Sequence, residues 1–395
     1  MTADHPTRRS GAARAGRIAG VAGAVVGLAA AGTAIGVTAS RMAARRAATG
    51  QWPETDVRTD AELREEDPLG LAARPADRTA LVQTDDGTVL AVEEIGPKDA
   101  PLTVVFVHGY TLSMASWTFQ RRALAAELAT ANGHRPAARL VFYDQRGHGA
   151  SGRGPAEHST IEQLARDLAT VIETRAPRGP VVLVGHSMGG MTIMGLAALR
   201  PELYGGRIVG AALISTPSGN LAELSFGLPE MLTRVRAAVL PVAAWTMRHR
   251  PAFAERTRRL AADLVSAATW SLSFASTDVD PALGRYVDAM IAGTPVEVIA
   301  EFYPALAGLD ETGSLEPLRA IPTLVLTGDQ DRMIPKEHSE LLAERLGWAG
   351  DNTVDHVVVP DAGHLVLLEK PEQVDEALTR LLRRVAAAAD VGSGA

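Results

Sequence analysis

Short strand-like runs, most of them wholly apolar, alternate with helical patterns along residues 78–390, and this alternation constrains the fold more than any other feature. A strand that is apolar along its whole length is typical of a sheet buried on both faces. The alternation therefore predicts an α/β fold with a mostly parallel central sheet flanked by helices. The strand-like runs are residues 79–84, 89–93, 102–107, 140–143, 181–184, 209–214, 323–326 and 356–359. The helical patterns are residues 117–130, 161–174, 188–199, 337–346 and 374–388.

The strongest local motif is Gly185-His186-Ser187-Met188-Gly189, which stands directly between a buried run and a helical pattern. A serine at so sharp a strand-to-helix turn has strained backbone angles, and glycine two residues away on either side relieves the crowding. Such a turn raises the hydroxyl from the sheet and directs the following N–H groups toward it. A glycine-rich turn with a chance serine is the alternative, but the flanking run and helix favour Ser187 as a nucleophile.

A serine nucleophile needs a base, and one of the ten histidines has a suitable position. His364 follows the last strand-like run, on a loop that begins with Asp361 and contains Gly363. The imidazole in turn needs an acceptor that fixes its tautomer and stabilises the imidazolium. Both Asp329 and Asp331 follow the run at residues 323–326, and the residues by themselves leave both open.

An oxyanion hole requires two N–H groups that point at the charge developing on the attacked oxygen. Met188 follows the predicted nucleophile and is expected to supply one backbone N–H. Tyr110 follows His108-Gly109 after the run at residues 102–107 and is expected to supply the other. An ordinary strand-ending turn is the alternative interpretation of His108-Gly109.

Residues 144–151, with the sequence DQRGHGAS, follow another strand-like run and are rich in turn-forming residues. We expect a structural role for this segment, in which Asp144 and Arg146 tie loops together beneath the site. His148 is not expected to be catalytic.

Residues 218–308 interrupt the alternation, because they contain no convincing strand and several helical stretches. These stretches include residues 231–248, 253–274 and 295–306. An all-helical insertion at this place predicts a cap over the active site. The core domain is then expected at residues 78–217 and 309–390.

Residues 18–39 carry no charge and lie between two groups of arginines. At about 1.5 Å per residue, a helix of this length crosses the hydrocarbon core of a bilayer. We therefore predict that residues 1–46 form a basic N-terminal segment with a transmembrane helix at residues 18–39, and that a polar linker follows at residues 47–77. A cleaved export signal ending at Ala39 and a disordered tail are the alternatives. The arginines leave the direction of the anchor nearly undetermined.

The charge of the chain is unevenly distributed. The formal net charge is −7 and the first fifty residues are basic, so the remainder carries about −13. An acidic body argues against nucleic acid as a partner, because phosphate binding needs a basic surface. The absence of cysteine excludes disulfides and thiolate metal sites. No phosphate loop or metal-ligand cluster is recognisable, so no cofactor and no metal are expected, and the sequence leaves the oligomeric state open.

In combination, these motifs resemble the α/β-hydrolase superfamily, and the resemblance covers about residues 78–390. The residues that carry it are HGY at 108–110, DQRGHGAS at 144–151, GHSMGG at 185–190, GDQDRMIP at 328–335 and DAGH at 361–364. Similar members place a glycine three residues before the catalytic aspartate and a proline four residues after it. Gly328 and Pro335 stand at these distances from Asp331, so the resemblance favours Asp331 over Asp329. It implies a triad of Ser187, Asp331 and His364, in the chain order usual for this fold.

The resemblance implies a serine hydrolase, such as an esterase or lipase, that cleaves a carboxylic ester or related acyl bond through an acyl-enzyme. Relatives that open epoxides or remove halides carry aspartate where Ser187 stands. A cofactor-free haloperoxidase or a carbon–carbon bond hydrolase could use the same triad and stays an alternative. A non-catalytic binding protein that retains the fold is the alternative from a different class. The expected partner is a small-molecule acyl substrate, and a lipophilic one if residues 18–39 hold the chain at a membrane.

Overall fold

The computed structural model describes residues 69–71, 74–128, 137–219, 245–250, 254, 269–276, 279–347 and 354–393. The predicted transmembrane helix at residues 18–39 and most of the linker at residues 47–77 lie outside the described residues. Within the described ranges, no helix combines the length and the apolar character needed to cross a membrane.

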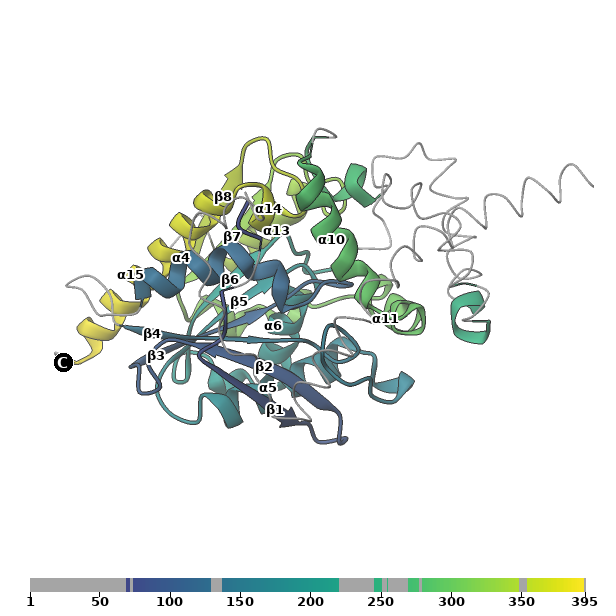
Figure 1. The fold of residues 1–395 in the computed structure, drawn as a ribbon. Coiled ribbons are helices and arrows are strands. Elements are labelled where there is room, and N and C mark those ends of the chain that lie inside the picture. Colours follow the sequence, from purple (N-terminus) through teal and green to yellow (C-terminus); the bar gives the residue numbers. More distant parts are fainter. Residues whose placement is uncertain are drawn as a thin grey trace, which may run out of the picture.

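Within the described residues, eight strands form one sheet in the order β1-β2-β4-β3-β5-β6-β7-β8 (Figure 1). The first two strands pair antiparallel, and β2 pairs antiparallel with β4, whereas all other neighbours are parallel. The predicted α/β fold with a mostly parallel sheet is therefore confirmed. The strands are β1 (Arg78–Gln83), β2 (Val89–Ile95), β3 (Leu102–Val107), β4 (Ala138–Tyr143), β5 (Val181–His186), β6 (Ile208–Ile214), β7 (Thr323–Gly328) and β8 (Val354–Val359).

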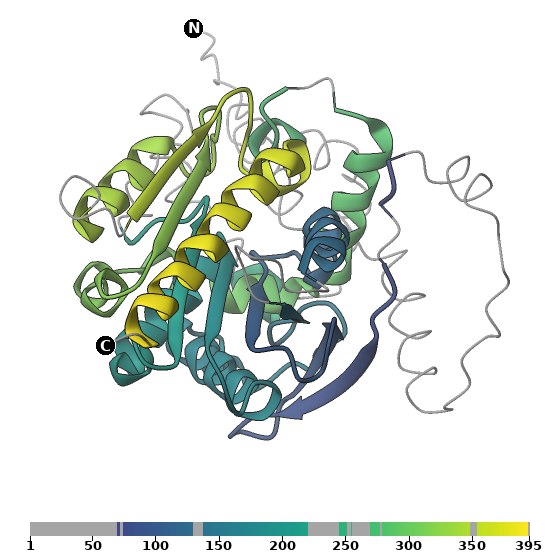
Figure 2. The same ribbon diagram turned by 90° about the vertical axis from the view of Figure 1, so that its left-hand side faces the viewer.

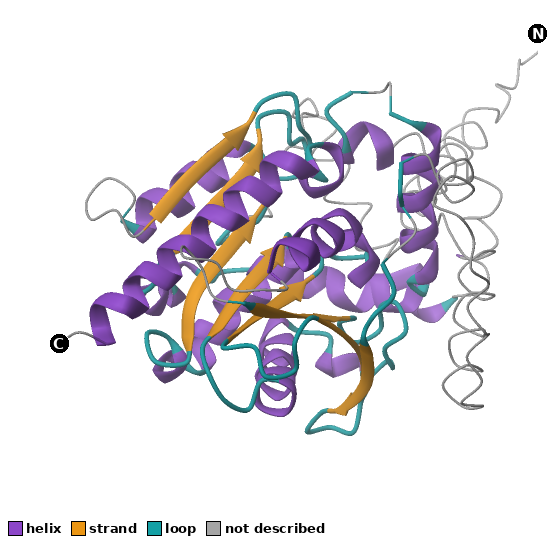
Figure 3. Ribbon diagram, turned by 60° about the vertical axis from the view of Figure 1, so that its left-hand side comes forward, coloured by secondary structure: helices purple, strands orange, loops and turns teal. Residues whose placement is uncertain are grey.

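Helices cover both faces of the sheet (Figures 2 and 3). Side chains alternate between the faces along each strand, so Phe106 of β3 packs beneath α4 and α15, whereas Val107 packs beneath α5 and α6. Because both faces are buried, the central strands are apolar throughout. The described helices are η1 (Met114–Trp117), α4 (Thr118–Leu128), η2 (Ala156–His158), α5 (Ile161–Arg175), α6 (Met188–Leu199), η3 (Pro201–Leu203), α10 (Pro281–Gly293), α11 (Val296–Ala307), η5 (Thr312–Ser314), α12 (Glu316–Arg319), α13 (Lys336–Leu346), α14 (Val366–Glu369) and α15 (Pro371–Ser393).

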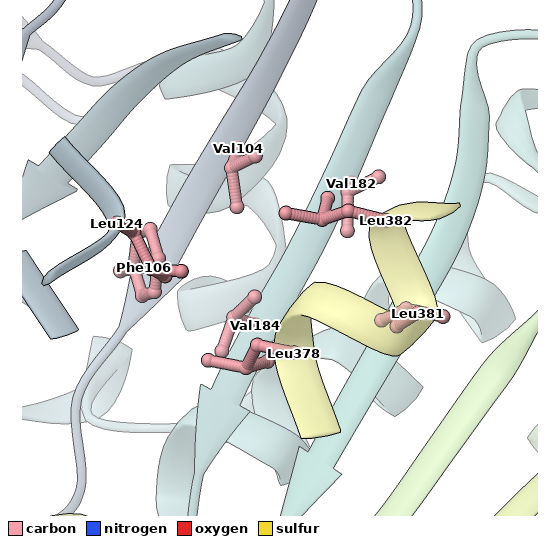
Figure 4. A pocket seen from close by; sticks show the side chains of 8 residues that line it. All are labelled: Val104, Phe106, Leu124, Val182, Val184, Leu378, Leu381 and Leu382. Carbon is pink, nitrogen blue, oxygen red and sulfur yellow. The ribbon is translucent and has the colours of Figure 1, made fainter. Parts of the chain in front are cut away.

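The C-terminal helix α15 packs its leucines on the centre of the sheet (Figure 4). The side chains that meet there leave no space for a water molecule. Truncating a buried leucine in such a core costs about 2–5 kcal/mol. This packing holds β3 and β5, whose carboxyl ends carry the loops of the candidate site. The side chains are Val104, Phe106, Leu124, Val182, Val184, Leu378, Leu381 and Leu382.

The chain leaves the core after Gly219 and returns at Asp310. These two residues pair as an isolated antiparallel bridge, and the N–H of Glu311 donates to the Ser218 carbonyl oxygen at 2.7 Å. Where the intervening segment is described, it is largely helical: residues 245–249, residues 269–273, α10 and α11. The last two helices lie beyond the carboxyl ends of the parallel strands (Figure 1).

The helices of this inserted segment match the sequence predictions unevenly. Helix α11 coincides with the predicted stretch at residues 295–306, whereas most of the stretches at residues 231–248 and 253–274 lie outside the described residues. Helix α10 was not predicted. Its start nevertheless carries a recognisable signal, because the Asp280 carboxylate accepts the Ala282 N–H at 2.7 Å and Pro281 occupies the first helical turn.

Candidate active site

Ser187 occupies a tight turn between the end of β5 and the start of α6. Its backbone has φ 51° and ψ −116°, a conformation that is strained for a residue with a side chain. The Ser187 N–H donates to the Ile214 carbonyl oxygen of β6 at 2.9 Å. Its carbonyl oxygen accepts the Gly190 N–H at 2.9 Å and the Thr216 hydroxyl at 2.8 Å. The main chain thus holds the strained residue on both sides.

The glycines around Ser187 allow this turn because no side chain fits at their positions. A Cβ atom at Gly185 would lie 2.5 Å from the Gly189 carbonyl carbon, and one at Gly189 would lie 2.1 Å from the Val107 carbonyl oxygen. Both distances are far shorter than a van der Waals contact. The spacing of glycine, serine and glycine therefore has a steric origin in this fold.

His364 and Asp331 form a buried pair at the carboxyl ends of β7 and β8. The His364 Nδ1 atom lies 2.8 Å from Asp331 Oδ2. The other carboxylate oxygen accepts the N–H groups of Met333 at 2.9 Å and Ile334 at 2.8 Å. These donors fix the Asp331 carboxylate, which in turn orients the imidazole with Nδ1 protonated and Nε2 as the proton acceptor.

The structure places Asp331, and not Asp329, against the histidine. The Asp329 N–H donates to the Val359 carbonyl oxygen at 2.9 Å. One of its carboxylate oxygens is buried and has no hydrogen-bond partner among the described residues. Asp329 thus belongs to the loop between β7 and α13 without reaching the imidazole.

His186 connects the serine turn to the histidine loop. Its Nε2 atom donates to the His364 carbonyl oxygen at 2.9 Å, and the centroids of the two rings are 4.9 Å apart. Burial holds the pKa of His186 well below its usual range, so the ring is neutral. In the described part of the chain, no hydrogen bond joins the Ser187 hydroxyl to the His364 ring. Such bonds are often long without substrate and tighten in the complex.

The loop after β3 lies directly against Ser187. A Cβ atom at Gly109 would lie 3.3 Å from the Ser187 Cβ atom. Tyr110 comes next, and Thr111 has a strained φ of 60°. Apart from the hydrogen bonds within helices and strands, neither the Tyr110 N–H nor the Met188 N–H donates to a backbone carbonyl oxygen of the described residues. The Tyr110 N–H lies on the loop after β3 and the Met188 N–H lies at the start of α6, and these two parts of the chain meet at Ser187.

His108 and Gln145 support this loop from beneath. The Gln145 N–H donates to His108 Nε2 at 2.9 Å, so the ring proton is on Nδ1, which donates to the Gly109 carbonyl oxygen at 2.8 Å. The Gln145 side-chain amide donates to the His108 carbonyl oxygen at 2.7 Å. Burial lowers the pKa of His108 to about 3, which keeps it neutral. No catalytic pattern in the sequence singles out Gln145, and its place in the DQRGHGAS segment is the one signal that indicates it.

Asp144 and Arg146 hold neighbouring loops together, as expected from the sequence. The Asp144 carboxylate accepts the N–H groups of Met114 and Ala150, each at 2.7 Å, although burial raises its pKa to about 6. Arg146 forms ion pairs with Asp167 at 2.6 Å and Asp86 at 2.7 Å. These contacts join the β1–β2 hairpin, α5 and the loop after β4.

The helices α10 and α11 are hydrogen-bonded to the loop after β3. The Tyr110 hydroxyl donates to the Ile299 carbonyl oxygen of α11. The Tyr286 hydroxyl of α10 donates to the Ala115 carbonyl oxygen at 2.8 Å. A largely apolar cluster connects α11 with the serine turn and the aspartate loop. Its buried members are Ile161, Leu164, Met188, Met191, Val298, Phe302, Leu309 and Ile334. The partly buried side chains packed against them are Tyr110, Leu306 and Met333.

Within the described residues, no group of three or more His, Asp or Glu side chains is arranged to hold a metal ion. The arrangement instead combines a serine at a strained turn, a histidine–carboxylate pair and two main-chain loops. Such a combination can perform nucleophilic attack with proton transfer.

The chain belongs to the alpha/beta hydrolase family, whose model matches residues 104–377. The predicted resemblance is therefore confirmed. Among solved structures, a thermophilic esterase from Thermogutta terrifontis is 27% identical, with a TM-score of 0.59, over 78% of this chain and 99% of that one. Among characterised relatives, the non-heme chloroperoxidase of Burkholderia pyrrocinia is 27% identical over 67% of this chain and 87% of the relative. The monoacylglycerol lipase of Mycolicibacterium smegmatis is 28% identical over 60% of this chain and 75% of the relative.

Proposed function

We propose that the protein is a serine hydrolase that cleaves a carboxylic ester or a related acyl bond. The observation that carries this proposal is the buried pair of His364 and Asp331, with 2.8 Å between Nδ1 and Oδ2, which His186 ties to the turn that bears Ser187. Membership of the alpha/beta hydrolase family supports it, as do the similar esterase and lipase.

In the proposed mechanism, the Ser187 hydroxyl attacks the acyl carbon while His364 Nε2 takes its proton. Asp331 accepts the Nδ1 proton in a hydrogen bond and stabilises the imidazolium. The backbone N–H groups of Tyr110 and Met188 bind the oxyanion, and one such donor is worth about 3 kcal/mol. His364 then gives its proton to the leaving group, and an acyl-enzyme remains on Ser187. Water, activated by the same histidine, releases the acid and restores the serine.

A lipophilic acyl group is the substrate that the surroundings of the site favour. Tyr110, Leu306 and Met333 are partly exposed at the edge of the apolar cluster around the serine turn. An acyl chain can exchange water for such surfaces, whereas a charged substrate would lose its hydration there. A membrane anchor at residues 18–39, which would bring the site near lipids, remains part of this proposal, and so does a helical cap at residues 218–308.

A cofactor-free haloperoxidase is the second candidate, because the chain is similar to the chloroperoxidase of Burkholderia pyrrocinia. In that case hydrogen peroxide would replace water as the nucleophile that releases the acyl group from Ser187. Halogenation that requires peroxide and a carboxylic acid, at a rate above ester hydrolysis, would favour this candidate.

The test compares the full chain with Ser187→Ala, using a fluorophosphonate probe and p-nitrophenyl esters of increasing acyl length. We expect labelling to vanish and turnover to fall by at least about 10³-fold, because the variant has no nucleophile. Ser339→Ala, which removes a buried hydroxyl on α13 that bonds to Lys336 and His356, is the matched control and should retain both activities. A folded wild-type protein that neither labels nor turns over any ester would favour the non-catalytic binding protein instead. Preference for short, soluble esters would argue against a lipophilic substrate.

A further inference from the structure

A short part of the inserted segment contacts both loops that carry the acid–base pair. We name residues 269–276 the return segment. Arg332, the neighbour of Asp331, donates from Nη1 to the Ser271 carbonyl oxygen at 2.7 Å and from Nη2 to the Ala275 carbonyl oxygen at 3.2 Å. On the other loop, the N–H of Leu365 donates to the Ser273 carbonyl oxygen at 2.9 Å. The return segment thus touches the residue that follows Asp331 and the residue that follows His364.

Glu369, the last residue of α14, links the His364 loop to the return segment. It binds the loop at Gly363, the residue before His364. Its Oε2 atom accepts the Gly363 N–H at 2.6 Å, and its Oε1 atom accepts the Ala275 N–H at 2.9 Å. Hydrogen bonds from N–H groups to a carboxylate are stronger than bonds between neutral groups. One carboxylate therefore clamps the residue before His364 to the return segment.

The two backbones lie so close that no side chain could stand between them. A Cβ atom at Gly363 would lie 2.6 Å from the Phe274 carbonyl carbon and 2.7 Å from the Ala275 nitrogen. The Phe274 side chain is fully buried in the main core. The main chain on both sides of His364 is accordingly held by the return segment, directly at Leu365 and through Glu369 at Gly363.

We propose that Glu369 is a positioning residue that, together with the return segment, holds His364 in place against Asp331. The inserted segment then takes part in assembling the acid–base pair and does more than cover it. This inference rests on the proposed hydrolase function. The Glu369 carboxylate acts on the main chain and does not touch the substrate, so its loss lowers kcat by displacing the imidazole and leaves substrate binding largely intact.

The clamp has a pH signature because only the ionised carboxylate accepts both N–H groups. Burial raises the pKa of Glu369, whereas its bonds to Gly363 and Ala275 lower it. Two nearby charges affect this pKa: Lys370 lowers it and Asp331 raises it. The third charge is the Arg332 guanidinium, which donates to the Ala275 carbonyl oxygen of the return segment. The proposed base must be free of its proton, which gives the acid limb of kcat a slope of one proton. Protonation of Glu369 opens the clamp and makes that limb steeper.

The experiment compares Glu369→Gln, Glu369→Asp and the control Glu340→Gln, each in the full chain. Glu340 lies on α13 and pairs with Lys336 at the surface, so its variant should match the wild type. In Glu369→Gln an amide NH₂ faces a backbone N–H, and we expect kcat to fall about 10- to 100-fold with KM changed less than about 3-fold. Its acid limb should have a slope of one proton. Glu369→Asp restores the charge and should recover part of kcat and the steeper limb.

Two outcomes overturn the inference. The first is a Glu369→Gln variant with the kcat, KM and acid limb of the control. The second serves if Glu369→Gln does not fold: a Glu369→Asp variant with the kcat and KM of the control, because the shorter carboxylate cannot keep both bonds at their lengths. Fluorophosphonate labelling of Ser187 in the wild type separates the two proposals. Labelling with an unaffected Glu369→Gln contradicts the clamp alone, whereas a wild type without labelling contradicts the hydrolase function and the clamp with it.

Discussion

Ser187 and His364 belong to the same candidate site, but different interactions hold them in place. The Ser187 turn is held by main-chain hydrogen bonds to β6 and by glycines that leave no room for side chains. The His364 loop is held by side chains, namely Asp331 and His186 from elsewhere in the chain and Glu369 from the end of α14, and by the return segment. We call these the nucleophile half and the acid–base half of the site.

The two halves of the site differ in which changes they can accept without loss of the fold. In the nucleophile half, a Cβ atom added at Gly185 or Gly189 meets backbone atoms, so the geometry and the fold fail together. In the acid–base half, a side chain can be shortened or neutralised while the core stays packed. The acid–base half can therefore be adjusted through single side chains, whereas the backbone geometry of the nucleophile half cannot.

Gly189→Ala should have the largest effect because it breaks the nucleophile half. The new Cβ atom would lie 2.1 Å from the Val107 carbonyl oxygen of a central strand. We expect a loss of more than about 4 kcal/mol in the free energy of unfolding, or no soluble protein. Gly293→Ala is the control, since among the described residues no atom beyond its chain neighbours and its own helix backbone lies within 4 Å of the added Cβ. Urea unfolding followed by circular dichroism measures both, and a Gly189→Ala variant as stable as the control would refute the steric account of the turn.

Asp331→Asn should affect activity most among variants that keep the fold. The amide no longer stabilises the imidazolium and favours the wrong tautomer of His364, so kcat should fall by about 10³- to 10⁴-fold. Asp329→Asn should change kcat by no more than a few-fold, because Asp329 does not reach the imidazole. Steady-state kinetics with a p-nitrophenyl ester compares them. Equal losses in both variants, or the larger loss in Asp329→Asn, would reverse the assignment.

A smaller effect should appear in the free energy of unfolding when the pH falls. It comes from two buried histidines that support the nucleophile half. Burial lowers the pKa of His108 to about 3 and that of His148 to about 4, below the value of about 6.5 in the unfolded chain. Between these values the unfolded chain binds more protons than the folded one, so stability is full above pH 6.5 and declines as the pH falls. Each histidine should cost about 2 kcal/mol at pH 5.

Urea unfolding at pH 7 and pH 5 tests this expectation. In His148→Gln, the difference in unfolding free energy between the two pH values should shrink by about 2 kcal/mol. The control is His249→Gln, because His249 is exposed and should leave the difference unchanged. If the stability of His148→Gln has the same pH dependence as that of the wild type, the pKa of His148 does not differ between the folded and the unfolded protein.

The sheet and the serine turn could be predicted because their determinants are local in sequence. The run at residues 102–107 and the helix at residues 188–199 match β3 and α6 in full. A strand buried on both faces must be apolar, and a sharp strand-to-helix turn must have small neighbours. Both requirements are visible in a few consecutive residues. Among the described helices that the sequence did not predict, α10 is the longest, and it too begins with a local signal at Asp280 and Pro281.

The partners of His364 depended on the tertiary structure. From the residues alone Asp329 and Asp331 were equivalent, and only the geometry of the loop after β7 brings Asp331 Oδ2 to 2.8 Å from the imidazole. Glu369 is 94 residues from Ala275 in the chain, and no local pattern connects them. The sequence by itself determined the strands, the turn and the types of reactive groups, because those follow from backbone sterics and burial. Which side chains meet across the site was decided by the packing of the loops after β5, β7 and β8 against one another and against the inserted segment, which no short stretch of sequence encodes.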